Sequence, residues 1–374
     1  MSKTNYKRLG DYIREVDVRN RDLKVTKLMG INIGKYFMPS VANVIGTDLS
    51  SYKVVAKNQF ACNLMHVGRD EKIPMAMFES NGSVIVSPAY FVFQISQLES
   101  LLPEYLMMWF RNPHFDKEAW FYTDSDVRGG MTKSALLDMK LPIPPIDQQQ
   151  KIVAEYNAIQ QRIKLNEQLI VKLEETAQTI YRKMFVDGID KNNLPEGWRI
   201  GTLGEIANIL DYKRKPLSAE QRALIKGEYP YFGAMSIIDY INDYIFDGVY
   251  LLFAEDGYVT DKNGHPNLQY VYGKFWLNNH AHIMQGNDIA STEYLYLALK
   301  QTVVTDLVTG AAQPKINQEN MSTIPIVVPN QSVIEQFNRV IKHLFDYKKS
   351  KEIENFKFKK IQSLLLVKMG QQNS

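Results

Sequence analysis

The longest periodic pattern in the chain runs from Asp147 to Asp187, where apolar or aromatic residues recur in alternating steps of four and three. This spacing predicts a helix that lies along a partner helix, because a lone helix of about 40 residues cannot bury its own stripe. Pro144-Pro145 precedes the pattern and Gly188 follows it, as expected at the two ends of a helix. The predicted positions at the helix-helix seam are Ile152, Tyr156, Ile159, Ile163, Asn166, Ile170, Leu173 and Ile180.

A second helix is predicted from Ser332 to Lys368, and Ser332 with Glu335 has the spacing of a capping box. Its apolar positions slip in register through residues 348–351, which predicts a stutter in the middle of the helix. The predicted seam positions on this helix are Phe337, Leu344, Ile361 and Leu365. Asn166 is the one polar residue on the first seam, and we interpret it as a residue that fixes register rather than as a functional contact.

The chain repeats itself at a period of about 181 to 185 residues, far longer than the repeat of a solenoid protein. Lys183-Met184 near the end of the first helix matches Lys368-Met369 near the end of the second. In the globular parts, residues 9–13 match 203–207, and residues 128–133 match 310–315. We therefore predict a first globular domain at 1–145, a first long helix at 146–190, a second globular domain at 191–328 and a second long helix at 329–374.

Both globular parts have more predicted strands than helices and no regular βαβ alternation, which favours the α+β class. If the two long helices pack antiparallel, the first carries the chain from one end of the pair to the other and the second returns it. The predicted fold is therefore two similar mixed α/β domains, held apart by two long antiparallel coiled-coil helices and related by an approximate two-fold axis.

Composition adds little to this fold but bounds the class of protein. The chain has 374 residues, of which 45% are hydrophobic and 23% charged, enough for two cores in a soluble protein. The single cysteine, Cys62, excludes a disulfide framework, and no signal peptide or membrane span is present in the sequence, so we expect a cytoplasmic protein. Segment 329–374 has a net charge of +5, whereas 191–328 has −4.

Sequence motifs for catalysis are missing. We find no Asn/Asp-Pro-Pro-Tyr or Pro-Cys methylation motif, no glycine-rich cofactor motif and no phosphate-binding loop, so the chain is predicted to carry out no chemistry. Asp256, Asp261 and Lys262 resemble a nuclease cluster, but an Asn-Gly turn between strands explains them better. His280 and His282 have a spacing that zinc sites use, yet no four-ligand set completes them, and a buried or base-facing pair is favoured.

Side chains that can distinguish base edges are gathered in the polar loops of both globular parts, where binding residues concentrate. For each one alone, a solvated surface or turn residue is the competing interpretation. The candidate DNA-binding residues are Asn63, His66, Arg69, Arg128 and Lys133 in the first part, and Lys213, Arg214, Asn278, Asn279, His280 and Lys315 in the second.

With this order of segments, the chain resembles the DNA-specificity subunit of type I restriction–modification systems. The stretches that carry the resemblance are residues 141–154, 194–207, 229–257 and 278–282. The second helix departs from the pattern, since its approach lacks the double proline. The resemblance implies that each globular part is a target recognition domain and that the helices are spacer regions that also dock methyltransferase subunits.

The family subunit is non-catalytic, so the resemblance implies no cofactor in this chain. Two modification subunits would methylate adenine in double-stranded DNA with S-adenosylmethionine, and restriction subunits would use ATP and Mg to translocate and cleave. The expected target is bipartite and asymmetric, with a spacer set by the helices. Two other interpretations remain open: a coiled-coil scaffold or adhesion protein, and a self-contained DNA-modifying enzyme.

Overall fold

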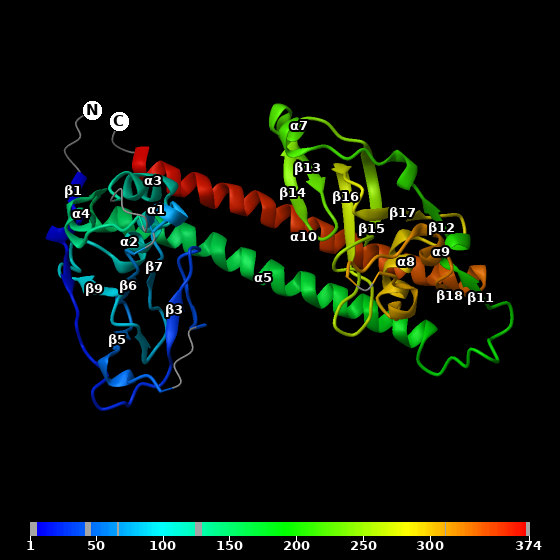
Figure 1. The fold of residues 1–374 in the computed structure, drawn as a ribbon, viewed down its shortest axis with the longest axis horizontal. Helices are drawn as coiled ribbons and strands as arrows, with labels where there is room; N and C mark the ends of the chain where they lie inside the picture. Colours follow the sequence, from blue (N-terminus) through cyan, green and yellow to red (C-terminus); the bar gives the residue numbers. More distant parts are fainter. Residues whose placement is uncertain (1–5, 42–45, 66, 124–128, 311, 372–374) are drawn as a thin grey trace. The chain divides into compact units, whose positions relative to one another are not determined.

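The chain forms two compact units, each of which combines one globular part with portions of both long helices. A computed structural model describes residues 6–41, 46–65, 67–123, 129–310 and 312–371 (Figure 1). Unit 1 comprises Met1–Leu165 and Glu354–Ser374, and unit 2 comprises Asn166–Ile353. Within the described residues, no helix has the length and apolarity that a bilayer crossing requires.

The two long helices are α5 (Ile146–Phe185, 40 residues) and α10 (Gln331–Gln371, 41 residues), close to the predicted ranges (Figure 1). They pair antiparallel within each unit. In unit 2 the end of α5 meets the start of α10, where the rings of Phe185 and Phe337 lie 5.0 Å apart. In unit 1 the Asn355 amide donates to the Ile163 carbonyl at 3.2 Å, and Tyr156 packs in one core with Leu366.

The seam predicted on the first helix lies on its buried side. Tyr156, Ile163 and Asn166 are buried, and the remaining predicted positions are half-buried. Sequence periodicity missed Tyr181 and Phe185, two buried aromatic residues in the last turns of α5. Their rings lie 5.1 Å apart in the core of unit 2.

The seam predicted on the second helix is wrong at Ile361. Phe337 is buried and Leu344 and Leu365 are half-buried, but Ile361 is 43% exposed. The predicted stutter is also wrong, because the buried face continues in helical steps through a lysine and an asparagine that the apolar pattern could not include. Its buried positions are Ile334, Phe337, Ile341, Phe345, Lys348, Asn355, Leu366 and Met369.

Unit 1 is built on an antiparallel sheet with strand order β2-β9-β6-β7. These strands are β2 (Ile13–Glu15), β9 (Phe91–Ile95), β6 (Phe60–Cys62) and β7 (Met75–Met77). The other strands form the pairs β1 (Tyr6–Arg8) with β10 (Lys140–Pro142), β3 (Met29–Ile31) with β4 (Phe37–Pro39), and β5 (Lys53–Ala56) with β8 (Ser83–Val86). The short helices are α1 (Val67–Asp70), α2 (Pro103–Phe110), α3 (Pro113–Phe121) and α4 (Lys133–Asp138), with 3-10 turns η1 (Leu9–Asp11) and η2 (Leu49–Ser51).

Unit 2 is built on a six-stranded sheet with strand order β12-β17-β15-β16-β13-β14. Its strands are β12 (Ala207–Ile209), β17 (Ala281–Gly286), β15 (Phe246–Ala254), β16 (Leu268–Leu277), β13 (Lys226–Phe232) and β14 (Ile237–Ile241), and β11 (Arg199–Thr202) pairs with β18 (Pro325–Val328). The short helices are α6 (Leu203–Ile206), α7 (Ala219–Leu224), α8 (Thr292–Leu299) and α9 (Gln318–Ser322), with 3-10 turns η3 (Asp211–Lys213) and η4 (Thr305–Leu307). Antiparallel pairing dominates both units, which confirms the α+β prediction.

The duplication predicted from the sequence is confirmed by strand order and register. Strands β2-β9-β6-β7 of unit 1 correspond to β12-β17-β15-β16 of unit 2, and α2 corresponds to α8. The hydroxyl of Tyr105 on α2 donates to the carbonyl of Pro142, and the hydroxyl of Tyr294 on α8 donates to the equivalent carbonyl of Val327. Unit 2 adds β13 and β14 to the shared plan, so the two domains are alike in fold but differ in their outer strands.

Candidate nucleic-acid interface

Three stretches that are far apart in the sequence meet where β15 ends and β17 begins in unit 2. The amide of Leu210, before η3, donates to the carbonyl of Ile283 on β17 at 2.8 Å. The amide of Glu255, after β15, donates to the carbonyl of His280 at 2.9 Å, and Asp256 forms a β-bridge with Lys315. This geometry brings together the six residues predicted for the second domain: Lys213, Arg214, Asn278, Asn279, His280 and Lys315.

Arg214 is the centre of an ion-pair network rather than an exposed side chain. One of its terminal nitrogens lies 2.6 Å from the Glu255 carboxylate and donates to the Ala281 carbonyl at 2.8 Å, and its side chain is only 15% exposed. Burial alone raises the pKa of the Glu255 carboxyl, but the hydrogen bond from Arg214 and the nearby charges of His282 and Lys315 hold that pKa below its ordinary value. Arg214 therefore links the segments that carry Glu255 and Ala281.

His282 is buried beside this network. Its Nδ1 atom is hydrogen-bonded to the Asp211 carboxylate, and its Nε2 atom lies 2.9 Å from the Ile316 carbonyl oxygen. Asp211, Glu255 and His282 offer ligand atoms within 4.8 Å of one another, the kind of set that can hold a metal ion. Because Arg214 already pairs with the carboxylates and Lys315 lies 3.1 Å from Glu255, we interpret the cluster as an ion-pair network.

The exposed groups around the network are the ones that a ligand can reach. Lys213 and Asn279 are exposed, and His280 is half-exposed with its Nδ1 atom 2.8 Å from the Asp256 carboxylate. That carboxylate holds the imidazole in one orientation. Asn278 is instead buried, and its side-chain oxygen accepts from the His280 amide at 2.9 Å, so it shapes the turn.

Two exposed aromatic residues on this surface were missed by sequence reasoning. Tyr212, in η3, is 78% exposed, and the Lys213 ammonium lies 5.7 Å from its ring centre. Tyr258, in the loop after β15, is 80% exposed. Aromatic rings beside basic groups are suited to stacking on bases and to cation–π contacts. The signal that could have identified them is their position in polar loops, where no apolar stripe needs an aromatic residue.

The equivalent place in unit 1 lies next to Asn63, one of the residues predicted for the first domain. The amide of Met131 donates to the Leu64 carbonyl at 2.8 Å, as the amide of Ile316 donates to the Glu255 carbonyl in unit 2. Asn63 is half-buried, and its side-chain oxygen accepts from the Met65 amide.

Among the other residues predicted for the first domain, only Lys133 has a described side chain. It pairs with the Glu15 carboxylate and lies over the Phe91 ring at 4.8 Å. His66 and Arg128 lie outside the described residues, and so does the side chain of Arg69. Exposed Phe121 and Tyr122, next to the β-bridge between Thr123 and Met131, add an aromatic pair that the sequence did not indicate.

Comparisons with known proteins agree on one class. Residues 195–362 match the family model described as "Type I restriction modification DNA specificity domain". Over 139 residues, 37% of this chain and 35% of the relative, the chain is 33% identical to the "Putative type I restriction enzyme specificity subunit S.HindORF215P" of Haemophilus influenzae. Over 280 residues, 65% of this chain and 64% of the relative, it is 21% identical to the MjaIX specificity subunit of Methanocaldococcus jannaschii. The matched regions thus span about a third and just under two thirds of these relatives.

The fold is also found among solved structures. The crystal structure of the type I restriction–modification system S subunit from M. genitalium superposes with a TM-score of 0.59 at 14% identity, covering 99% of this chain and 97% of that one. At this identity the match bears on the fold alone, and it extends over both units.

Proposed function

We propose that the chain is a non-catalytic subunit of the type I restriction–modification DNA specificity class, whose family model matches residues 195–362, and that it binds a bipartite, asymmetric DNA target. Each unit would contact one half of the target. The observation that carries this proposal is the duplicated fold, in which the same end of each shared sheet is surrounded by loops of different sequence. A common scaffold with different exposed side chains is what two unlike half-sites require.

The exposed groups in unit 2 support base contact more than the buried ones do. We propose that Lys213, Asn279 and His280 contact the DNA, with Tyr212 and Tyr258 beside them. Arg214 and Asn278, which have little exposed surface, would hold these loops in place. The more exposed Lys315 would support them through its ion pair with Glu255. In unit 1 the corresponding contacts would come from the segment around Asn63 and from Phe121 and Tyr122.

We propose that the paired helices set the length of the unread spacer, the base pairs between the two half-sites that the protein does not recognise. We also propose that these helices dock two methyltransferase subunits. Support comes from the length of the helices and from their antiparallel pairing in each unit. The basic α10 would contact DNA phosphates. S-adenosylmethionine, ATP and Mg would be used by the modification and restriction subunits rather than by this chain.

Exchanging residues 1–140 for the first domain of another family member should change one half of the methylated target and leave the other half and the spacer unchanged. This is expected because each unit has its own core and its own exposed loops. Single-molecule methylome sequencing of cells that carry the exchanged subunit and its methyltransferase measures both halves at once. A change in both halves would contradict independent recognition, and a methylome that does not respond to the exchange would favour a scaffold role.

Two neighbouring substitutions separate DNA contact from structural support. Arg214→Met leaves the buried Glu255 carboxylate without its closest cation and should lower the free energy of unfolding of unit 2 by about 3–5 kcal/mol. Lys213→Ala should change the free energy of unfolding by less than about 0.5 kcal/mol. It should weaken DNA binding and make that binding less dependent on salt concentration, as expected from the loss of about one phosphate contact. Urea unfolding and a salt titration of DNA binding by the methyltransferase complex measure the two effects. Equal losses of stability in both variants would show that Arg214 has no special structural role.

A further inference from the structure

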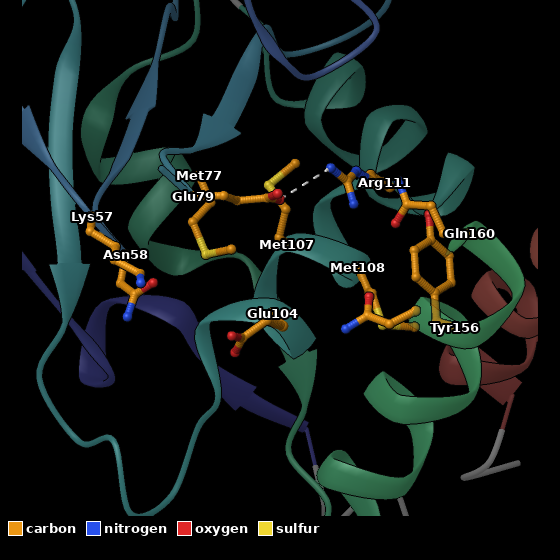
Figure 2. Close-up of a pocket in the computed structure, with 11 residues that line it drawn as sticks. Lys57, Asn58, Met77, Glu79, Glu104, Met107, Met108, Arg111, Tyr156 and Gln160 are labelled. Carbon is orange, nitrogen blue, oxygen red and sulfur yellow. Dashed lines mark ion pairs between the residues drawn. The ribbon is translucent and has the colours of Figure 1, made fainter. Parts of the chain in front are cut away.

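Unit 1 contains an open cavity of about 240 Å³ between β7, α2 and the first half of α5. Figure 2 shows Met77 and Met107 together on one side of it, Tyr156 and Gln160 projecting from α5, and Glu104 at its edge. None of the residues proposed to contact DNA lines the cavity, but one of its walls is α5, a helix that the proposed function assigns to docking partner subunits.

Unit 2 fills the equivalent place with aromatic rings. Strand register makes Tyr270 the counterpart of Met77, since Phe60 pairs with Met77 and with Phe93 just as Leu251 pairs with Tyr270 and with Met284. Helix positions make Tyr296 on α8 the counterpart of Met107 on α2, and Phe345 on α10 the counterpart of Gln160 on α5.

The three rings of unit 2 pack closely against one another. The ring centres of Tyr270 and Phe345 are 4.8 Å apart, those of Tyr270 and Tyr296 are 5.8 Å apart, and those of Tyr296 and Phe345 are 6.0 Å apart. The Tyr270 hydroxyl donates to the Glu293 carboxylate at 2.5 Å. Unit 1 has kept that carboxylate as Glu104, but it has no aromatic residue at the three ring positions.

We propose that the cavity of unit 1 receives a tyrosine side chain from a partner polypeptide. Its ring would lie against Met77 and Met107, and its hydroxyl would donate to Glu104, as the Tyr270 hydroxyl donates to Glu293 in unit 2. An apolar cavity of about 150 Å³ holds a benzene ring, so the volume is sufficient for a phenol. Methionine side chains adapt to a ring and make favourable sulfur–aromatic contacts.

The charges at the cavity fit a polypeptide better than a nucleic acid. Glu79 and Glu104 at the opening offset the charges of Lys57 and Arg111, so the opening lacks the net positive charge that a phosphate-binding site requires. Arg111 lies 3.9 Å from Glu79, and the Lys57 ammonium donates to Asn81, so both cations already have partners. A tyrosine inserted in a pocket with a polar rim is a common anchor of protein interfaces.

Methyl NMR of the full chain with ¹³C-labelled methionine tests the chemistry of the cavity with p-cresol, the tyrosine side chain itself. We expect p-cresol to shift the Met77 and Met107 methyl signals in a saturable way, and toluene to bind about fivefold more weakly because it cannot donate to Glu104. The exposed Met235 of unit 2 is the reference signal and should not shift. Absence of a saturable shift, or equal binding of toluene and p-cresol, would overturn the proposal.

A variant that copies unit 2 is the matched control. Met77→Tyr with Gln160→Phe should fill the cavity and abolish the p-cresol shifts. Gln160→Phe alone, at an exposed position, serves if the double variant does not fold. Retention of the p-cresol shifts in a folded, filled variant would show that the ligand binds elsewhere.

A crosslinking experiment identifies the polypeptide that supplies the tyrosine. Lys57 at the opening is replaced by the photo-crosslinker p-benzoylphenylalanine, and the chain is co-expressed with the modification and restriction genes of its own locus. We expect a crosslinked peptide that contains a tyrosine, whose replacement by alanine weakens association with the wild-type chain by at least about tenfold and has no such effect with the filled variant. Crosslinks to DNA alone, or a tyrosine whose replacement has no effect, would refute the polypeptide assignment.

Discussion

Replacing Phe337 by alanine is expected to lower the free energy of unfolding of unit 2 by about 3–5 kcal/mol. Phe337 on α10 is 1% exposed, and its ring lies 5.0 Å from Phe185 and 6.0 Å from Tyr181 on α5, and 5.6 Å from Tyr294 on α8. The smaller side chain leaves a cavity where three helices meet, because the neighbouring rings are held by the two other helices and cannot all move into the space. Urea unfolding followed by the fluorescence of Trp198, whose ring contacts Phe185, measures the loss.

The matched control is Phe356→Ala on the same helix. Phe356 is 68% exposed, so its removal should change stability by less than about 0.5 kcal/mol. Both changes remove the same atoms from one helix, and only burial distinguishes them. A similar loss in the two variants would mean that the buried face of α10 has been assigned incorrectly.

The difference between the seams of α5 and α10 shows which buried helix positions can be predicted from the periodicity of apolar residues. On α5 the buried stripe is mostly apolar, so counting apolar residues locates it. On α10 the stripe passes through Lys348, whose ammonium lies 2.6 Å from the Glu174 carboxylate. Burial alone raises the pKa of the Glu174 carboxyl, but the charge of Lys348 and the hydrogen bonds from Lys348 and Tyr296 hold that pKa below its ordinary value. A lysine buried by a partner on another helix cannot be recognised from its own neighbours in the sequence.

The roles of residues in the candidate site also depend on partners that the local sequence does not reveal. The residue types and the loops were predictable, and the six residues predicted for the second domain do meet in space. Their individual roles were not predictable, because Lys213 and Arg214 are adjacent basic residues and only the position of Glu255 separates an exposed cation from a paired one. Tyr212 and Tyr258 were missed because aromatic residues usually indicate core. The cavity of unit 1 was not predictable, because Met77 and Met107 are ordinary core residue types in the sequence.

If the helix pair sets the spacer, lengthening both helices should lengthen the spacer. Insertion of one heptad after Leu165 in α5 and one before Glu354 in α10 should lengthen the unread spacer of the methylated target by about three base pairs, without altering either half-site. Seven residues add about 10.5 Å to a helix, and one base pair of DNA rises about 3.4 Å. A whole heptad keeps the buried stripes of the two helices facing each other. These positions are where the chain passes between the two units, so neither core is interrupted.

Methylome sequencing of cells that carry the lengthened subunit and its methyltransferase reads the spacer directly. Each added base pair also rotates one half-site about the DNA axis, so we expect weaker methylation at the lengthened sites. Seven residues inserted into the loop 186–198, outside both helices, are the matched control and should leave the spacer unchanged, whereas a heptad in α5 alone leaves seam residues without partners and should abolish methylation. An unchanged spacer in the doubly lengthened subunit would mean that something other than the helix pair, such as the partner subunits, measures the distance between half-sites.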